Sequence, residues 1–352
     1  MSDQTYFERV HSHTPSPDFE NLLAVLNKDV PARPTLFEFF LNGRLYNSLS
    51  KITPKPGDDE MVNLEYIVGA FQQAGYDYVT YKPPQFVFPR GVRERAQTIS
   101  LNDGAVITDR ASLDTCPWIE PDECDYSQLD KIRDVLPDGM KVVVNGPGGV
   151  LENVIALMGY ESLCYAVADD PELARDVFDA VGARLLRHYE IAAPYESVGA
   201  CISNDDWGFK TQPMLSPDTM REYCFPWHKR FVEVVHAHGK PVILHSCGQP
   251  AEIMDDVIED MKFDGRHSYE DTIQPVEEAY EQYGERIAIL GGIDVDFVIR
   301  SSPDEVYQRS KAMLRRAEGR GSFALGTGNS VPEYVPDENY CAMTWAALEA
   351  RV

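Results

Sequence analysis

The sequence contains no apolar run that approaches the roughly 18 residues needed to cross a membrane. Its first ten residues have neither a basic segment nor an apolar segment, so they do not predict a secretory signal peptide. Positive charge is also scarce, because 32 Lys and Arg face 57 Asp and Glu and the formal net charge is −25. A surface this acidic repels phosphate backbones and anionic membranes, so we expect neither a nucleic-acid partner nor a membrane partner.

Cysteine is sparse and follows no pattern. The seven cysteines form no paired framework, and Cys116 and Cys124 lack the spacing of a metal-binding pair. An odd number of cysteines in a long chain without a signal peptide is typical of reduced thiols, which predicts a cytoplasmic protein. No Gly-x-Gly-x-x-Gly run follows the early apolar segments, and this disfavours an open dinucleotide-binding sheet.

From residue 35 onward, short apolar runs alternate with longer segments of helical period. Alternation of this kind is typical of parallel strands joined by crossover helices. The expected strands are 35–41, 76–82, 141–145, 200–204, 241–245, 265–269, 287–291 and 322–326. The expected helices between them include 150–168, 217–238 and 251–261. Eight strand–helix units favour a (β/α)8 TIM barrel over an open doubly wound sheet.

Two features depart from a plain barrel. Residues 1–34 are polar and bear prolines, so they are expected to form an N-terminal extension. A hairpin is expected near 93–110, because two short apolar runs there flank the turn sequence Asn102-Asp103-Gly104. With these additions, residues 1–352 are predicted to form one domain.

A TIM barrel places its chemistry at the C-terminal ends of the strands. In this sequence, polar and metal-capable side chains follow nearly every predicted strand. They are Glu38, Asn145, Asp205, Asp206, His245, Cys247, Glu270, Asp294, Thr327 and Asn329. Helices that face solvent would not concentrate such residues at strand ends, so we expect the active site at this edge of the barrel.

His245 and Cys247 are the most informative of these residues. They are two positions apart in an extended chain, so both side chains point the same way. Imidazole and thiolate are natural Zn²⁺ ligands, and the pair therefore predicts a zinc site. A buried pair that binds nothing is the alternative, because two ligands do not define a site. Glu270 is the candidate for a further ligand or a catalytic base.

The carboxylates at the strand ends have more than one interpretation. Asp205 and Asp206 are candidates for a general acid or base, a metal ligand or an anchor for the substrate, although either residue could simply cap a loop. Asp294 follows two glycines that permit close backbone approach to a ligand, yet it could also cap the next helix. Glu38 lies in an apolar strand, where burial would raise the pKa of its carboxyl group.

The predicted substrate-binding residues come from several strands. They are Glu38, Asn145, Asp294, Thr327 and Asn329. These residues supply amide, hydroxyl and carboxyl groups, which can fix the orientation of a small molecule by hydrogen bonds.

Several longer runs carry a resemblance to a known family. They include Phe225-Pro226-Trp227-His228-Lys229, the segment from Gly239 to Gly248, and Leu290-Gly291-Gly292-Ile293-Asp294. With Ser216-Pro217-Asp218 and the ending 336–340, these runs resemble the uroporphyrinogen decarboxylase superfamily over about residues 135–350. The resemblance implies a (β/α)8 barrel, in agreement with the strand count.

The superfamily contains two chemistries. Its true decarboxylases act on tetrapyrrole acetates without a metal, and they share an arginine-rich N-terminal motif and a Gly-His-Gly in the last strand. Here the corresponding stretches read Pro34-Thr-Leu-Phe-Glu-Phe-Phe and Gly326-Thr327-Gly328. Both departures disfavour porphyrinogen decarboxylation.

The other branch comprises corrinoid-dependent methyltransferases, in which a His-x-Cys pair and a further cysteine in the last strand hold zinc. His245 and Cys247 match the pair, whereas Thr327 stands at the third position. The resemblance implies an enzyme that moves a methyl group between methylcobalamin on a separate corrinoid protein and a small thiol or methyl ether. It also permits a homodimer. A metal-free decarboxylase and a non-catalytic tetrapyrrole or corrinoid binder are the alternatives.

Overall fold

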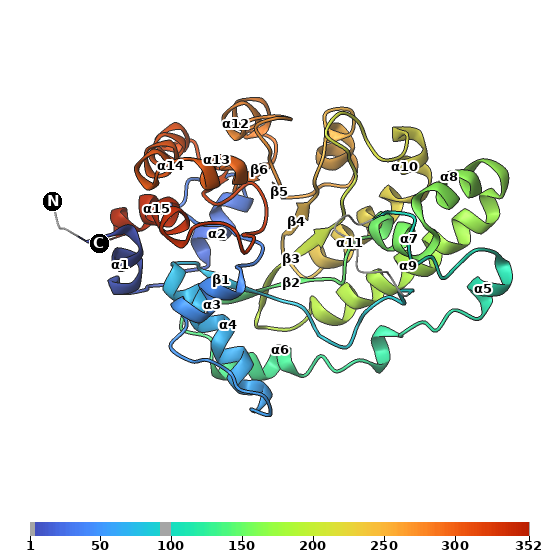
Figure 1. The fold of residues 1–352 in the computed structure, drawn as a ribbon, viewed down its shortest axis with the longest axis horizontal. Helices are drawn as coiled ribbons and strands as arrows, with labels where there is room; N and C mark the ends of the chain where they lie inside the picture. Colours follow the sequence, from blue (N-terminus) through green and yellow to red (C-terminus); the bar gives the residue numbers. More distant parts are fainter. Residues whose placement is uncertain (1–3, 92–99, 352) are drawn as a thin grey trace.

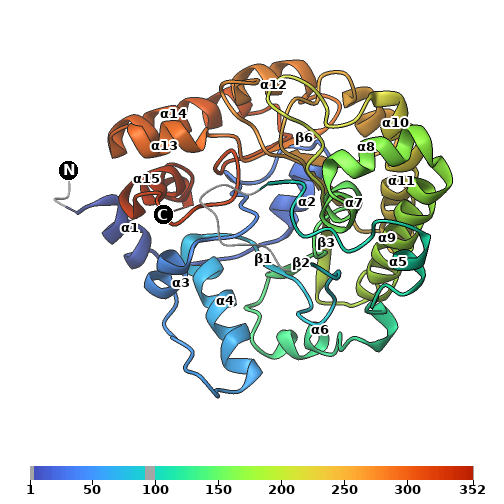
Figure 2. The ribbon, with the colours of Figure 1, turned by 45° about the vertical axis from the view of Figure 1, so that its right-hand side comes forward.

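The computed structural model describes residues 4–91 and 100–351, and its sheet is a curled set of parallel strands. The strands follow one another in chain order (Figure 1). They are β1 (Tyr78–Tyr81), β2 (Lys141–Asn145), β3 (Val198–Asn204), β4 (Val242–His245), β5 (Gly265–His267), β6 (Ala288–Leu290) and β7 (Phe323–Ala324). Helices surround the strands as an outer ring (Figure 2). The predicted α/β class with a TIM-barrel architecture is confirmed.

The eighth strand position is occupied by a short segment rather than a full strand. Of the expected strand at 35–41, the structure keeps a single parallel bridge between Leu36 and Leu325. Phe37 N–H donates to the Leu325 carbonyl at 2.8 Å on this side. On the other side, the Tyr78 hydroxyl donates to the Glu38 carbonyl at 2.5 Å and accepts the Glu38 N–H at 2.7 Å. Because this hydroxyl forms hydrogen bonds with both backbone groups of Glu38, a side chain joins the segment to β1.

The helices alternate with the strands along the chain. Before β1 they are α1 (Tyr6–Ser12), α2 (Glu20–Leu26), α3 (Gly43–Leu49) and α4 (Glu60–Ala74), and before β3 they are α5 (Arg110–Asp114), α6 (Gln128–Lys131), α7 (Val150–Met158), α8 (Tyr160–Asp169) and α9 (Pro171–Ala192). After β3 they are α10 (Pro217–Tyr223), α11 (Phe225–His236), α12 (Val276–Tyr283), α13 (Val295–Arg300), α14 (Pro303–Ala317) and α15 (Asp337–Leu348).

Three expected helices differ from the structure. The helix expected at 150–168 breaks at Gly159, whose φ of 80° is incompatible with a continuous helix. The one expected at 217–238 restarts at Phe225, because Pro226 has no N–H to donate and is tolerated only in a first turn. Of 251–261, only residues 254–260 are helical, and Asp256–Asp260 within them is π-helical.

The expected hairpin near 93–110 is not a hairpin in its described part. Residues 92–99 lie outside the described residues. Residues 101–104 form the expected turn, but residues 105–108 are not a strand. Instead, Val106 N–H and Ile107 N–H both donate to the Leu157 carbonyl, at 2.7 and 2.9 Å. The second arm is therefore tied to the end of α7.

The N-terminal extension packs on the barrel. The Glu338 carboxylate in α15 accepts the backbone N–H groups of Tyr6 and Phe7, at 2.7 and 3.0 Å, which docks α1. Phe19 and Leu26 flank the start of the strands, because a Cβ added at Gly199 or Gly265 would meet them at 2.4 and 2.8 Å. The extension thus covers the N-terminal side of the barrel, and the opposite rim is the one that carries the predicted site.

One cluster of buried apolar side chains runs from Val10 in α1 to Leu348 in α15. In the described part of the chain, no single helix is long and apolar enough to span a membrane. Helices α7 and α8 meet those limits only when taken together, and they are bent by 96° at their junction.

Candidate metal centre

Three of the predicted site residues converge at the ends of β3 and β4. The ligand atoms of Asp206, His245 and Cys247 all lie within 4.8 Å of one another. His245 Nε2 is 4.0 Å from Cys247 Sγ, and Asp206 Oδ1 accepts the Cys247 N–H at 2.9 Å. An imidazole, a thiol and a carboxylate form a donor set that suits Zn²⁺, and three protein ligands are typical of catalytic zinc, which keeps one position open.

Two hydrogen bonds fix the tautomer of His245. His267 Nε2, at the end of β5, lies 3.2 Å from the Thr327 carbonyl oxygen, which can only accept, so this nitrogen carries the hydrogen. His267 Nδ1 then accepts from His245 Nδ1 at 2.8 Å. His245 Nε2 is left with a lone pair, and this is the nitrogen nearer to Cys247. A metal-ligating histidine usually donates its other ring N–H to a nearby acceptor, which orients the ring, and His267 Nδ1 supplies that acceptor here.

His245 and Cys247 are both uncharged at neutral pH. Burial, reinforced by the neighbouring His267, holds the pKa of His245 well below its usual value, so the imidazole is uncharged and able to coordinate a metal. Burial and the adjacent Asp206 raise the pKa of Cys247 to about 12. Ser268 Oγ and Asn329 Nδ2 point at the sulfur from 3.3 and 3.4 Å and oppose this shift. A cation at the cluster would favour the thiolate.

Thr327 turns its hydroxyl to Glu38 and supplies no ligand to the cluster. Its N–H donates to Glu38 Oε1 at 2.6 Å, and its Oγ1 lies 2.9 Å from Glu38 Oε2 and also contacts the Asn329 carbonyl. One hydroxyl has one hydrogen, so both contacts are satisfied when Glu38 is protonated and donates to Thr327. Burial raises the pKa of Glu38 to about 8, which agrees with this arrangement. The chain of bonds positions Asn329 beside Cys247.

Asp205 and Asp206 are adjacent in sequence but face different surroundings. Asp205 is fully buried and accepts the Leu151 and Glu152 N–H groups at 2.9 and 2.8 Å, so it caps the start of α7. It also lies 2.9 Å from His228 Nε2. With Cys224, these two residues form a second, wholly buried cluster of metal-capable atoms. The carboxylate of Asp205 is therefore saturated by protein groups, and Asp206 is the one that faces His245 and Cys247.

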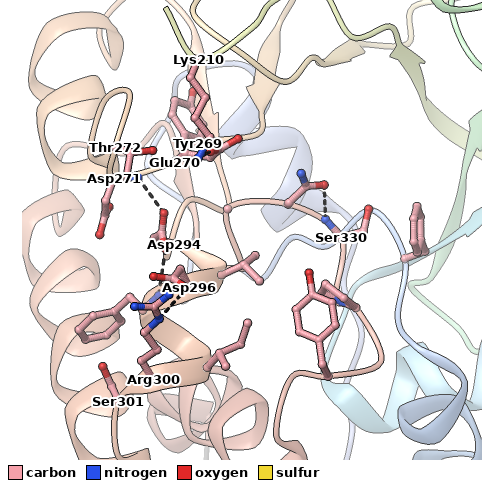
Figure 3. A pocket seen from close by; sticks show the side chains of 18 residues that line it. Lys210, Tyr269, Glu270, Asp271, Thr272, Asp294, Asp296, Arg300, Ser301 and Ser330 are labelled. Atoms are coloured by element: carbon pink, nitrogen blue, oxygen red, sulfur yellow. Dashed lines mark hydrogen bonds and ion pairs between the residues drawn. The ribbon is translucent and has the colours of Figure 1, made fainter. Parts of the chain in front are cut away.

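A cavity of about 970 Å³ opens at the ends of β5 to β7 (Figure 3). Glu270, Asp294 and Asn329 line it. Glu270 Oε2 lies 3.3 Å from Lys210 Nζ, and in the described residues it belongs to neither metal-capable cluster. Asp294 caps α13 by accepting the Phe297 N–H at 2.9 Å. Asn329 links the cavity to the cluster, because its amide also reaches Cys247 Sγ.

The remaining predicted residue, Asn145, lies at the end of β2. It lines another cavity, of about 700 Å³, at the ends of β1 to β3. His267 holds the imidazole of His245 and was not among the residues predicted for the site. Its place at the end of β5, directly beside His245 in the pairing of β4 with β5, is the signal that would have found it.

Comparisons with known proteins agree with this architecture. Residues 129–349, well over half of the chain, match the uroporphyrinogen decarboxylase family. A uroporphyrinogen decarboxylase from Myxococcus xanthus is 30% identical over 173 residues, which are 48% of this chain. The match spans 46% of that relative's length, so the chain aligns with about half of it.

Solved structures show the same fold. A methyltransferase from Methanosarcina mazei superimposes with a TM-score of 0.67 at 17% identity, covering 94% of this chain and 98% of that one. A putative vitamin-B12 independent methionine synthase from Listeria monocytogenes has a TM-score of 0.52 at 12% identity and covers 96% and 98% of the two chains. Identities this low establish the fold alone. With the barrel, the strand-end site and the match over residues 129–349 together, the chain belongs to the uroporphyrinogen decarboxylase family.

Proposed function

We propose that this protein is a Zn²⁺-dependent, methyltransferase-like enzyme. It would move a methyl group between methylcobalamin, carried on a separate corrinoid protein, and a small molecule such as a thiol or a methyl ether. The observation that carries the proposal is the convergence of Asp206, His245 and Cys247 within 4.8 Å. The shared fold with a methyltransferase supports it.

In this proposal Asp206 fills the ligand position for which the sequence pointed to Glu270. Its carboxylate already holds the Cys247 backbone at 2.9 Å, so it is fixed beside the other two donors. Glu270 stays at the cavity wall, paired with Lys210. Zinc at such a site lowers the pKa of a substrate thiol or polarises an ether oxygen.

Other residues hold the proposed metal ligands in position. His267 and Thr327 keep the lone pair of His245 on Nε2, and the buried Glu38 fixes the position of Thr327. Asn329 separates Cys247 from the cavity of about 970 Å³, where it can contact a bound molecule. Asp205 acts through α7 as a positioning residue.

The test is an assay of methyl transfer from methylcobalamin to 2-mercaptoethanol, in which the loss of methylcobalamin absorbance measures the reaction. Cys247→Ala and Asp206→Asn are expected to abolish turnover while the folded structure survives, and Cys116→Ala, outside the cluster, should retain it. Circular dichroism would verify folding of each variant. Full activity of a folded Cys247→Ala protein would contradict the proposal.

A metal-free decarboxylase is the second candidate, and the match to the Myxococcus xanthus enzyme favours it. Asp206 would then stabilise the protonated ring of a tetrapyrrole substrate, because Asp205 is saturated by α7 and His228. This candidate predicts loss of a substrate carboxyl group in the presence of a strong chelator. Methyl transfer that a chelator abolishes would exclude it.

A further inference from the structure

The second cavity of the rim has an apolar wall. It has a volume of about 700 Å³ and is bordered by Phe39, Phe40, Tyr46 and Phe88 among other residues. Cavities of this size bury a small organic ligand, and aromatic side chains favour the flat face of a ring. Apolar walls alone would suit any apolar molecule, so the charged groups decide what binds.

The charged groups that line this cavity are both cationic. They are Lys82 and Arg90, and no carboxylate lines the cavity among the described residues. Neither side chain forms an ion pair with another described residue. Burial and the neighbouring Asp205 raise the pKa of Glu152 to about 8, and Arg90 lies near enough to oppose this shift. Glu152 accepts the Gly149 N–H and does not line the cavity. Two cations that form no ion pair among the described residues are unexpected in a chain with a net charge of −25.

The first cavity shows the opposite pattern. Its lining includes four carboxylates and two cations. Each cation there has a carboxylate partner, because Lys210 lies 3.3 Å from Glu270 and Arg300 lies 2.8 Å from Asp296 (Figure 3). Among the described residues, the rim therefore offers one acidic cavity with paired charges and one basic cavity whose cations lack a carboxylate partner.

The basic cavity adjoins the candidate metal centre. Phe39 lines it, and the Phe39 ring lies 4.8 Å from the His245 ring, measured between centroids. Phe40 lines both cavities. The Phe39 ring therefore contacts both the basic cavity and His245.

We propose that the basic cavity is the binding site for a small organic carboxylate with an apolar, ring-shaped body. The ring lies against the phenylalanines, and the carboxylate is held by Lys82 and by the planar guanidinium of Arg90, which suits bidentate contact. The inference names the substrate class of the proposed methyl transfer and rests on that function for its catalytic meaning. The binding itself needs neither zinc nor a corrinoid.

The test compares an acid with its neutral amide. The full chain is titrated with 4-fluorobenzoate and with 4-fluorobenzamide, and ¹⁹F NMR line widths give the two dissociation constants. The acid is expected to bind at least about tenfold more tightly, because a hydrogen bond to a charged group contributes more than one between neutral groups. The double variant Lys82→Gln/Arg90→Gln should reduce that preference to about twofold or less.

Lys141→Gln is the control for a loss of positive charge elsewhere, because it removes one cation at the start of β2, which is the opposite end of the barrel. It should keep the full preference for the acid. Equal binding of acid and amide, no detectable binding of the acid, or a preference that survives in the double variant would overturn the proposal. Displacement of the acid by inorganic phosphate at equal concentration would show a site for any free anion and would also overturn it. Methyl transfer can fail while the acid preference persists, so the two proposals are separable.

Discussion

At the scale of single residues, Glu38 is a carboxyl group that the fold stabilises in its uncharged form. It is fully buried, and its carboxyl group is hydrogen-bonded to the backbone N–H and the hydroxyl of Thr327. Its pKa rises from 4.5 to about 8 because burial penalises the charge. A raised pKa in the folded state means that the stabilising contribution is complete below about pH 4.5 and is lost as the pH rises through about 8.

Glu38→Gln is expected to remove this pH dependence. The amide can donate to Thr327 as the protonated acid does, so the variant stays folded. Between about pH 5 and about pH 9, the wild type should lose several kcal/mol of unfolding free energy relative to the variant, at about 1.4 kcal/mol per pKa unit. Urea denaturation at each pH measures this, with the exposed Glu285→Gln as control. Parallel stability curves for wild type and Glu38→Gln would refute the assignment.

His267 is expected to control metal affinity without being a ligand. His267→Phe removes the acceptor that holds the hydrogen on His245 Nδ1, so zinc should bind about 10–100-fold more weakly. Competition with a chromophoric chelator gives the affinity. His236→Phe is the control, because His236 pairs with Asp264 near the surface. Unchanged affinity in His267→Phe would mean that the tautomer is set by other groups.

At the scale of elements, α7 depends on a cap that comes from another part of the chain. Gly149 precedes the helix, and a Cβ there would meet the Asp205 side chain at 2.1 Å. The close approach lets Asp205 accept two N–H groups of the first turn. A glycine at this position is required because any larger residue would displace the cap.

The two neighbouring aspartates are therefore expected to behave differently. Asp205→Ala leaves two helix N–H groups and His228 without their acceptor, which should cost about 2–4 kcal/mol of unfolding free energy. Asp206→Ala should change stability by about 1 kcal/mol or less, yet abolish zinc binding. Denaturation curves and metal content, measured on both variants, distinguish the two roles. Zinc loss in folded Asp205→Ala with full zinc in Asp206→Ala would reverse the assignment.

The elements themselves were largely predictable, because strands that are buried on both faces appear as continuous apolar runs such as 141–145. The sequence did not predict the break at Gly159 or the loss of the second hairpin arm, since both depend on contacts made by other segments. It also could not choose between Asp206 and Glu270. The pairing of β3 with β4 places Asp206 beside the His-x-Cys turn, and this geometry is the basis for proposing Asp206.

At the scale of the whole molecule, the ring is closed by a side chain. The Tyr78 hydroxyl satisfies both backbone groups of Glu38 and joins the segment at 35–38 to β1. One continuous core, which includes Val10 and Leu348, supports the proposal that residues 1–352 form a single domain.

Tyr78→Phe is expected to destabilise the barrel by about 1–3 kcal/mol or more, because it leaves a buried N–H and a buried carbonyl unpaired. Tyr66→Phe, which removes an exposed hydroxyl bond to Asn47, should cost about 0.5 kcal/mol or less. Thermal unfolding compares the two. Equal stability of both variants would contradict this prediction, because it would show that the junction between the segment at 35–38 and β1 tolerates the unpaired groups.

The most direct test of the proposed metal centre is the zinc content of the whole protein, purified without chelators. About one zinc per chain is expected in the wild type, and none in His245→Ala/Cys247→Ala or in Asp206→Asn. Glu270→Gln should retain it, because that carboxylate pairs with Lys210 instead. A wild type that takes up no zinc, or an Asp206→Asn protein that keeps it while Glu270→Gln loses it, would contradict the proposed centre.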